Sequence, residues 1–388
     1  MRVLMPGVLF VLVMAQPNLA TGMMPLYRAR WDLAPLLITV VFAVYLLALV
    51  PTLTVLGRPA NRSGWWWRIA AGATAGVAAD VVMALADSAA VACVARVAAG
   101  LSVGLVTGSV SGLILERVGD RGRTTMATAT VLGSAVGTIA AAVVAQYLPA
   151  PTVTVYLVHG VLLAVVAIAV VLDRAATAPS VAVVGSTPSS TARHHPTTGY
   201  LSGIAAWVSA GLVVALLPSY GATVLHTRDL AVLAAPVTVY LVAAWLAQRL
   251  IPVTSRLAEP PVAQAFIVVG VIVAGLVPVV PDVTTLLVAG VVAGIGQGLA
   301  YRAGLQIVSA ASGPGDHARA ASRYAAVAYL FAAVATIGFG AVATASSMSS
   351  AVVVAAVVLG VLLLATLVTT ARRVVPAPPP GPPSDVLV

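Results

Sequence analysis

Twelve apolar runs, each long enough to cross a lipid bilayer, are the feature that most constrains what this chain can fold into. A spanning helix needs about 20 predominantly apolar residues, because it rises about 1.5 Å per residue through a hydrocarbon core about 30 Å thick. Only 8% of the residues are charged, against about 25% in soluble domains, so the lipid bilayer must cover most of the surface. The sequence therefore predicts an all-α membrane protein with twelve transmembrane helices. The runs cover residues 3–24, 35–56, 66–86, 89–113, 125–147, 152–172, 200–220, 230–251, 263–280, 283–309, 324–345 and 350–371.

The rest of the composition excludes several kinds of site. Cys93 is the single cysteine, so the sequence offers neither a disulfide nor a cysteine cluster for a metal. The net charge of +9 comes from arginines without any lysine, and these arginines lie mostly between the apolar runs. We therefore expect no metal, no cofactor and no nucleic-acid partner. We also expect the run after Arg2 to be retained as the first helix, because no cleavage site followed by a polar mature domain is present.

The placement of the arginines predicts how the chain is oriented. With the N-terminus inside, fifteen arginines fall in inner loops and tails, three in outer loops (Arg28, Arg30 and Arg228) and two within apolar runs (Arg96 and Arg302). Cytoplasmic loops of membrane proteins are enriched in arginine and lysine. We therefore predict a multi-pass protein of the cell membrane with both termini in the cytoplasm.

A polar segment divides the chain into two halves. Residues 173–199 are rich in Ser, Thr and Pro and cannot bury enough apolar surface to fold, so we interpret them as a cytoplasmic linker. The predicted parts are an N-terminal six-helix half (1–172), this linker, a C-terminal six-helix half (200–371) and a disordered cytoplasmic tail (372–388).

Residues of the two halves match at offsets of 194 to 196 positions. The matched positions are six helices apart, and six is an even number. The halves are therefore parallel repeats, related by an axis along the membrane normal. The matches are Tyr45 with Tyr240, Arg62 with Arg256, Gly100 with Gly294, Gly104 with Gly298, and Gly119-Asp120 with Gly315-Asp316.

Two motifs make the chain resemble the major facilitator superfamily. The loop after the second run reads Gly57-Arg58-Pro59-Ala60-Asn61-Arg62-Ser63-Gly64, which is similar to the family signature G-x-x-x-D-R-x-G. The fourth run carries Arg96-x-x-x-Gly100, which is similar to the family's R-x-x-x-G pattern. The resemblance implies the major facilitator fold and a bacterial transporter of the efflux type. It also implies a conformational-switch loop formed by Gly57, Asn61, Arg62 and Gly64.

The chain departs from the family at two points. Asn61 stands where the signature has an acid, which in the family is thought to hold a charge network between helices in the outward-facing state. The fifth run keeps Gly133-x-x-x-Gly137 but lacks the Gly-Pro of the family's antiporter signature. Both departures weigh against a typical drug/proton antiporter.

Charges within the apolar runs mark candidate functional residues, because each costs roughly 2.5–3.5 kcal/mol to insert. Asp80 and Arg96 flank the turn at Asp87-Ser88 symmetrically. In an antiparallel hairpin they would lie at one depth, about 12 Å below the outer surface. We expect them to form an ion pair, which either takes part in proton coupling or fixes the packing of two helices.

Polar residues on other runs complete the predicted cavity. Helices one, four, seven and ten line the cavity in the family, and this favours residues such as Gln16, Asn18 and Gln297. Arg302 continues a stripe of glycines, and it either reaches the cytoplasmic interface or offers its guanidinium to an anionic substrate or a carbonyl. His159 either titrates near neutrality or is a hydrogen-bonded packing residue. The predicted cavity set is Gln16, Asn18, Tyr45, His159, Tyr240, Gln297, Tyr301 and Arg302.

These features predict a secondary active transporter, not an enzyme. The chain has no lysine and hence no phosphate-binding loop with the Gly-Lys-Ser/Thr pattern, so an ion or solute gradient must drive transport. We expect a monomer that moves a small, moderately hydrophobic organic solute by alternating access, through proton-coupled efflux. An uptake permease, and a sensor or scaffold that has lost transport, are the alternatives. Asn61 is the residue that favours the last of these.

Overall fold

The structure is a computed structural model that describes residues 4–56, 62–118, 121–173, 195–312 and 317–371. These residues form twelve α-helices and one short 3-10 helix, η2 (Arg256–Ala258), and they contain no strand. The helices of the N-terminal half are α1 (Leu4–Trp31), α2 (Pro35–Leu56), α3 (Arg62–Ala84), α4 (Ala89–Val118), α5 (Arg121–Tyr147) and α6 (Pro151–Leu172). Those of the C-terminal half are α7 (Pro196–Val224), α8 (Leu230–Leu250), α9 (Pro260–Gly275), α10 (Val283–Ala310), α11 (His317–Ala345) and α12 (Met348–Ala371).

The twelve helices coincide with the twelve predicted runs, so the fold class predicted from hydropathy is confirmed. Ten of the described helices are long and apolar enough to cross a membrane, and α9 is apolar but shorter. The protein is therefore a multi-pass membrane protein. Several helices extend beyond their apolar runs: α1 reaches Trp31 and α11 begins at His317. Hydropathy marks only the part of a helix that lies in hydrocarbon, so it misses turns that project past the lipid core.

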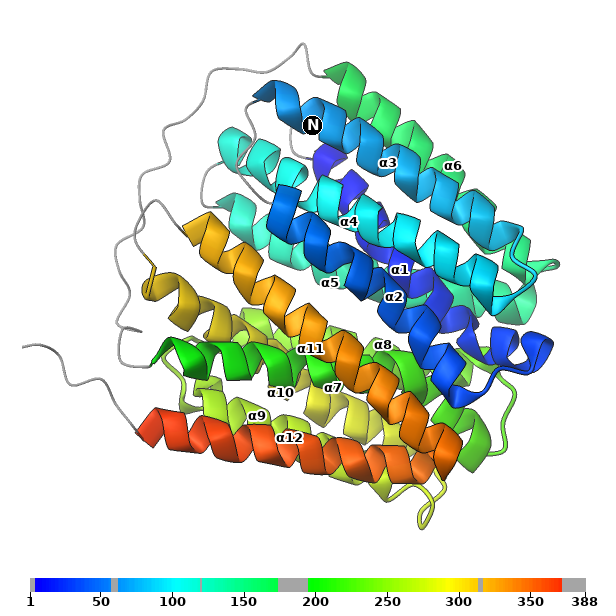
Figure 1. The fold of residues 1–388 in the computed structure, drawn as a ribbon, viewed down its shortest axis with the longest axis vertical. Helices are drawn as coiled ribbons and strands as arrows, with labels where there is room; N and C mark the ends of the chain where they lie inside the picture. Colours follow the sequence, from blue (N-terminus) through cyan, green and yellow to red (C-terminus); the bar gives the residue numbers. More distant parts are fainter. Residues whose placement is uncertain (1–3, 57–61, 119–120, 174–194, 313–316, 372–388) are drawn as a thin grey trace, which may run out of the picture.

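The two halves repeat the same packing, as Figure 1 shows with the N-terminal half above and the C-terminal half below. In the first half α1 packs on α5, α2 on α4 and α3 on α6. In the second, α7 packs on α11, α8 on α10 and α9 on α12. The repeat seen in the sequence is thus a repeat of helix neighbours.

Stripes of glycine bring α4 against α2 and α10 against α8. A β-carbon at any of four of these glycines would overlap a backbone carbonyl of the facing helix. Close backbone approach is what small residues provide in lipid, where no hydrophobic force drives helices together. These glycines therefore allow the helices to pack closely, whereas Gly108 faces open space. The glycine–carbonyl pairs are Gly100 with Tyr45, Gly290 with Pro236, Gly294 with Tyr240, and Gly298 with Ala244.

The halves meet along α2 with α11 and α5 with α8. We call the helix ends nearest the two chain termini the inner ends and the opposite ends the outer ends (Figure 1). Hydrogen bonds join the halves at the outer ends: Leu36 N–H donates to Thr344 Oγ1 at 2.9 Å, and Leu230 N–H to Gln146 Oε1 at 2.9 Å. Arg28 of α1 adds a bond of 3.3 Å to Thr223 Oγ1 of α7. The halves are closed against each other at the outer end.

Candidate functional site

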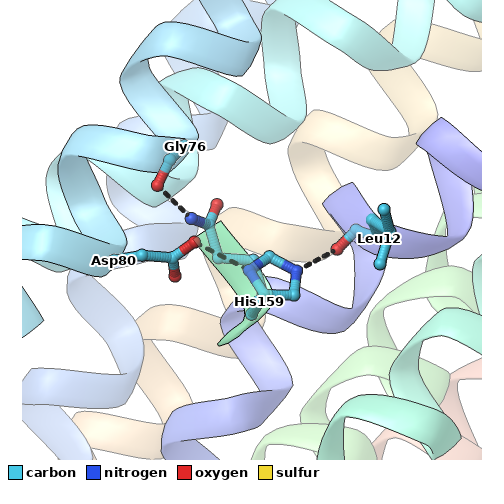
Figure 2. A network of polar contacts seen from close by, with 5 residues as sticks. Leu12, Gly76, Asp80 and His159 are labelled. Carbon is cyan, nitrogen blue, oxygen red and sulfur yellow. Dashed lines mark hydrogen bonds and ion pairs between the residues drawn. The ribbon is translucent and has the colours of Figure 1, made fainter. Parts of the chain in front are cut away.

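A buried acid–imidazole pair lies inside the N-terminal half. Asp80 of α3 and His159 of α6 are 1% and 6% exposed, and Nδ1 of His159 lies 2.7 Å from Oδ2 of Asp80. Gly160 packs against Asp80, since a β-carbon at this position would lie 3.4 Å from Cβ of Asp80, which is an ordinary van der Waals contact. Figure 2 shows the imidazole held between Asp80 on one side and the Leu12 carbonyl of α1 on the other. The pair therefore connects three helices at one point.

Both ring nitrogens of His159 face hydrogen-bond acceptors. Nε2 lies 3.0 Å from the carbonyl oxygen of Leu12, which can only accept. Oδ2 of Asp80 accepts as well when the carboxyl group is ionised. The geometry is satisfied by imidazolium with carboxylate, or by neutral imidazole with a carboxylic acid. Both arrangements contain the same number of protons, so the site as built holds one proton in addition to Nε2–H and is electrically neutral.

Loss of that proton has a structural consequence. The pair would then carry a net charge of −1 inside an apolar half-protein, which is costly. The ring would keep one N–H for two acceptors, and the bond to the carboxylate is the stronger because it is charge-assisted. The bond that His159 makes to the Leu12 carbonyl would therefore be lost. Proton occupancy of the pair is in this way linked to how α1 is held.

A second bond ties α1 to α3 one helical turn away. Gln16 donates from Nε2 to the Gly76 carbonyl at 2.5 Å. Leu12 and Gln16 are four apart on α1, and Gly76 and Asp80 are four apart on α3, so each helix uses a single face. Oδ1 of Asp80 and Oε1 of Gln16 are buried without a hydrogen-bond partner. Unpaired buried acceptors are costly, so these two oxygens mark the face between α1 and α3 as incompletely satisfied.

Other buried ionisable groups of the N-terminal half lie near one another on α1, α4 and α6. Tyr156 lies one turn before His159 on α6, and its hydroxyl is 3.0 Å from that of Tyr27 on α1. Arg96 of α4 is a further buried charged residue of this half, and it is 2% exposed.

The Asp80–Arg96 ion pair predicted from the hairpin does not form. Arg96 donates from Nε to the Val41 carbonyl at 3.1 Å and from Nη1 to the Pro17 carbonyl at 2.7 Å. Its guanidinium carbon also lies 4.5 Å from the ring centre of Tyr45. The two charges were predicted at one depth, but depth does not decide which way a side chain points. Arg96 precedes Gly100 by one turn on the stripe that faces α2, so it is directed away from α3.

Arg302 likewise binds the helix that its glycine stripe faces. Its Nη1 donates to the Gln248 carbonyl of α8 at 2.5 Å, one turn beyond the contact of Gly298 with Ala244. A cation in the last turn of a helix stabilises the free carbonyls and the negative end of the helix dipole. The structure thus places Arg302 against the backbone of α8, and both interpretations of Arg302, the cytoplasmic interface and the substrate cavity, stay predictions.

The other predicted cavity residues are dispersed over both halves. Tyr240 is fully buried in the C-terminal half, with its hydroxyl 3.0 Å from Ser209 Oγ. Asn18 donates to the Met14 carbonyl within its own helix at 2.9 Å. Gln297 is 9% exposed on α10. The ring of Tyr301 on α10 lies 6.0 Å from the ring of Trp207 on α7.

Most of the predicted switch loop lies outside the described residues. Gly57 and Asn61 fall in the gap 57–61, and the side chain of Arg62 is also outside the described part. Gly64 is buried in the first turn of α3. The structural role of this loop remains an expectation from the resemblance.

Comparison with known proteins identifies the fold. No protein-family model matches the sequence, and no curated protein matches it. A bacterial homologue of the human lysosomal transporter Spinster, in an inward-facing and occupied conformation, superposes with a TM-score of 0.71 at 14% identity, covering 97% of this chain and 98% of that chain. The nucleoside transporter NupG superposes with a TM-score of 0.71 at 13% identity, covering 95% and 99%. The chain has the major facilitator fold.

The major facilitator fold gives the acid–imidazole pair its position. The pair lies within the N-terminal six-helix half and contacts α1 at the Leu12 carbonyl. The outer end of α1 carries Arg28, which contacts α7. α1 therefore contacts both the pair and the opposite half.

Proposed function

We propose that this protein is a secondary transporter that moves a small, moderately hydrophobic organic solute across the cytoplasmic membrane in exchange for protons. The observation that carries the proposal is the Asp80–His159 pair, in which both imidazole nitrogens face acceptors at 2.7 and 3.0 Å. Such a pair binds and releases one proton at a cost that depends on its surroundings. A buried ionisable pair inside a membrane protein is a candidate proton relay for this reason.

The proposed mechanism links this proton to the movement of the halves. With the proton bound, His159 holds α1 through the Leu12 carbonyl, and Gln16 holds it through Gly76. When the proton leaves, the Leu12 bond is lost and α1 is freed to shift against α3 and α6. Its other end carries Arg28, which contacts Thr223 of α7. Movement of α1 would weaken this outer contact and favour opening of the outer end, as alternating access requires.

Two further features are consistent with transport. The outer end is closed, as in the inward-facing Spinster homologue. The few charges inside the membrane fit a weakly charged organic solute. The arginines between the apolar runs predict cytoplasmic termini, which fits a protein of the cell membrane.

An uptake permease is a second candidate function. The similarity to NupG, a nucleoside transporter, favours it. The same acid–imidazole pair would serve symport if the proton and the solute bound to one conformation together. Efflux and uptake would use the same proton-binding residues. They differ in whether the protein changes conformation with the proton and the solute bound together or with one of them bound at a time.

The Asp80→Asn variant tests the proposal. Asn cannot release a proton, so the variant should lose transport driven by a pH gradient while it still exchanges labelled solute across the membrane. Inverted membrane vesicles are energised to form a pH gradient, and a panel of organic solutes is added. A solute that the wild type exchanges for protons will dissipate the gradient, and with Asp80→Asn the dissipation should fall at least tenfold.

Asp87→Asn, in the exposed turn of the same hairpin, is the matched control and should behave as the wild type. Dissipation of the gradient by Asp80→Asn at the wild-type rate would rule out the pair as the coupling site. If no solute dissipates the gradient with the wild type, and the wild type exchanges no labelled solute, the sensor or scaffold alternative is favoured.

A further inference from the structure

The N-terminus of α2 is completed by a side chain of the opposite half. The first N–H groups of a helix have no carbonyl partner within the helix, and the side chain of the preceding residue often accepts one of them. Before α2 that residue is Ala34, which has no side-chain acceptor, and Pro35 after it has no N–H. The next N–H, that of Leu36, donates to Oγ1 of Thr344 on α11 at 2.9 Å. α2 is therefore capped by the C-terminal half.

The N-terminus of α8 receives the same kind of bond from the N-terminal half. Oδ1 of Asp229, the residue before α8, accepts hydrogen bonds from the N–H groups of Ala231 and Val232 at 2.9 and 3.1 Å. The N–H of Leu230, the first residue of α8, donates to Oε1 of Gln146 on α5 at 2.9 Å. Each of the two helices thus uses a side chain of the opposite half for one N–H of its first turn.

The two caps occupy equivalent places in the repeat. Leu36 and Leu230 are 194 residues apart, which is the offset that also relates Gly100 to Gly294. Their acceptors lie on α11 and α5, the fifth helices of the two halves, and α2 with α11 and α5 with α8 are the contacts along which the halves meet. The two bonds are therefore related as in a two-fold interface, and a movement that parts the halves at the outer end breaks both.

The chemistry of both acceptors suits a bond that opens and closes. The hydroxyl group of Thr344 donates to the Gly340 carbonyl of its own helix at 2.9 Å, which leaves its lone pairs for Leu36. The side chains of Thr344 and Gln146 are exposed. When the halves part, water can take the place of each acceptor, so no buried donor is left unsatisfied. Each bond is therefore weak enough to break reversibly.

We propose that Thr344 and Gln146 form a two-part latch, which holds the outer end closed by capping α2 and α8 across the halves. Loss of a helix cap typically changes an equilibrium constant about fivefold, which corresponds to about 1 kcal/mol. The two caps share no residue, so their effects should multiply to about 25-fold. The inference goes beyond the proposed proton exchange, because such a latch acts on the movement of the halves whatever solute or ion drives it.

Access to position 39 reports whether the outer end is open. Thr39 of α2 is buried and packs on Gly340 of α11. A cysteine at position 39, in a Cys93→Ala background, should therefore react with a hydrophilic maleimide only while the halves are apart. At reagent concentrations for which labelling is slower than closing, the labelling rate is proportional to the open fraction. The full-length protein in lipid nanodiscs is labelled without solute or pH gradient, so the measurement does not depend on transport.

The Gln146→Met variant decides the outcome. Met has about the length of Gln but only a weak acceptor. Gln146 belongs to the contact of α5 with α8, whereas the labelled position belongs to the contact of α2 with α11. A local loosening of α8 would leave the rate at position 39 unchanged, but opening of the whole outer end should raise it about fivefold. The wild-type rate in Gln146→Met would overturn the proposal. If this variant is not monodisperse, Gln146→Leu takes its place.

The other cap supplies the second test. Thr344→Val keeps the shape of the side chain without its hydroxyl group and should raise the labelling rate about fivefold, and the double variant with Gln146→Met about 25-fold. A rise with Thr344→Val but none with Gln146→Met would show local fraying of α2 and refute the latch.

Three controls keep the caps or leave them alone. Thr344→Ser keeps the hydroxyl group, and Gln146→Glu keeps an acceptor and adds a negative charge at the positive end of α8. Neither should label more than twofold faster than the wild type. Ser346→Ala removes an exposed hydroxyl group that bonds the Val342 carbonyl at the end of α11, and it should label at the wild-type rate. Faster labelling in all three would show that any change at the outer end opens it, which would refute the assignment.

The latch and the proposed proton site can fail separately. A rate raised by Gln146→Met, in a protein whose pH-driven transport Asp80→Asn leaves unchanged, would keep the latch and remove the proton site. The wild-type rate in Gln146→Met, together with loss of pH-driven transport in Asp80→Asn, would do the reverse.

Discussion

At the scale of single residues, the protein places its two intramembrane arginines against backbone carbonyls rather than against acids. Arg96 binds carbonyls of two helices, Val41 on α2 and Pro17 on α1, and its guanidinium lies over the ring of Tyr45. Arg302 binds the Gln248 carbonyl. A planar guanidinium can serve two diverging carbonyls, whereas an ammonium group offers a single point charge. The two arginines therefore act as connectors between helices.

The Arg96→Lys variant should be destabilised for this reason. The change keeps the charge but cannot serve both carbonyls, and one lost charge-assisted hydrogen bond is worth about 2 kcal/mol. Thermal unfolding of the purified protein in detergent should show a lower midpoint. Arg228→Lys, on an exposed outer loop, should leave the midpoint unchanged. A wild-type midpoint for Arg96→Lys would show that the two carbonyl contacts contribute little.

Residue chemistry also explains which parts of the site were predictable. Hydropathy and the cost of intramembrane charge identified Asp80, Arg96 and His159 from the sequence, but the predicted pairing was wrong. His159 lies about as far from the outer end of α6 as Asp80 lies from the hairpin turn, so the same depth argument would have allowed this pair. The glycine stripe of α4 carried the missing information, because it fixes the face on which Arg96 lies.

At the scale of helices, the stripe on α10 sets how closely the second and fourth helices of the C-terminal half approach. Gly294 faces the Tyr240 carbonyl, where a β-carbon would overlap, whereas Gly108 of α4 has no atom within 4 Å of where a β-carbon would lie. The ring contacts of Trp207 with Tyr301 and Tyr329 depend on the tertiary arrangement as well, since the three residues come from helices that are far apart in the sequence. No local pattern in the sequence predicts such a group.

These two glycines form a matched pair for a test. Gly294→Ala should destabilise the protein by about 1–3 kcal/mol, because the extra methyl group forces α8 and α10 apart. Gly108→Ala should be neutral or stabilising by up to about 1 kcal/mol, because alanine has the higher helix propensity. The fraction of monodisperse protein after heating in detergent measures both. Equal stability of the two variants would contradict the proposed role of the stripe.

At the scale of the whole molecule, the two halves meet along α2 with α11 and α5 with α8. Their outer ends are held by few hydrogen bonds, among them those of Leu36 with Thr344 and Leu230 with Gln146. A small number of bonds that can break together suits a contact that opens in each transport cycle. The acid–imidazole pair, which we propose as the proton site, lies inside one half, so α1 and its outer contact through Arg28 would have to connect this pair with the opposite half.

Locking the outer end tests this connection. Thr39 of α2 packs directly on Gly340 of α11, so cysteines at these positions, in a Cys93→Ala background, should form a disulfide under oxidation after a small local shift. The cross-linked protein should lose transport and recover it when the disulfide is reduced, because α2 and α11 can no longer separate. Each single-cysteine variant is the control and should transport regardless of oxidation. Full transport by fully cross-linked protein would show that the outer contact of α2 and α11 need not open in the cycle, and α5 with α8 would then have to provide the opening.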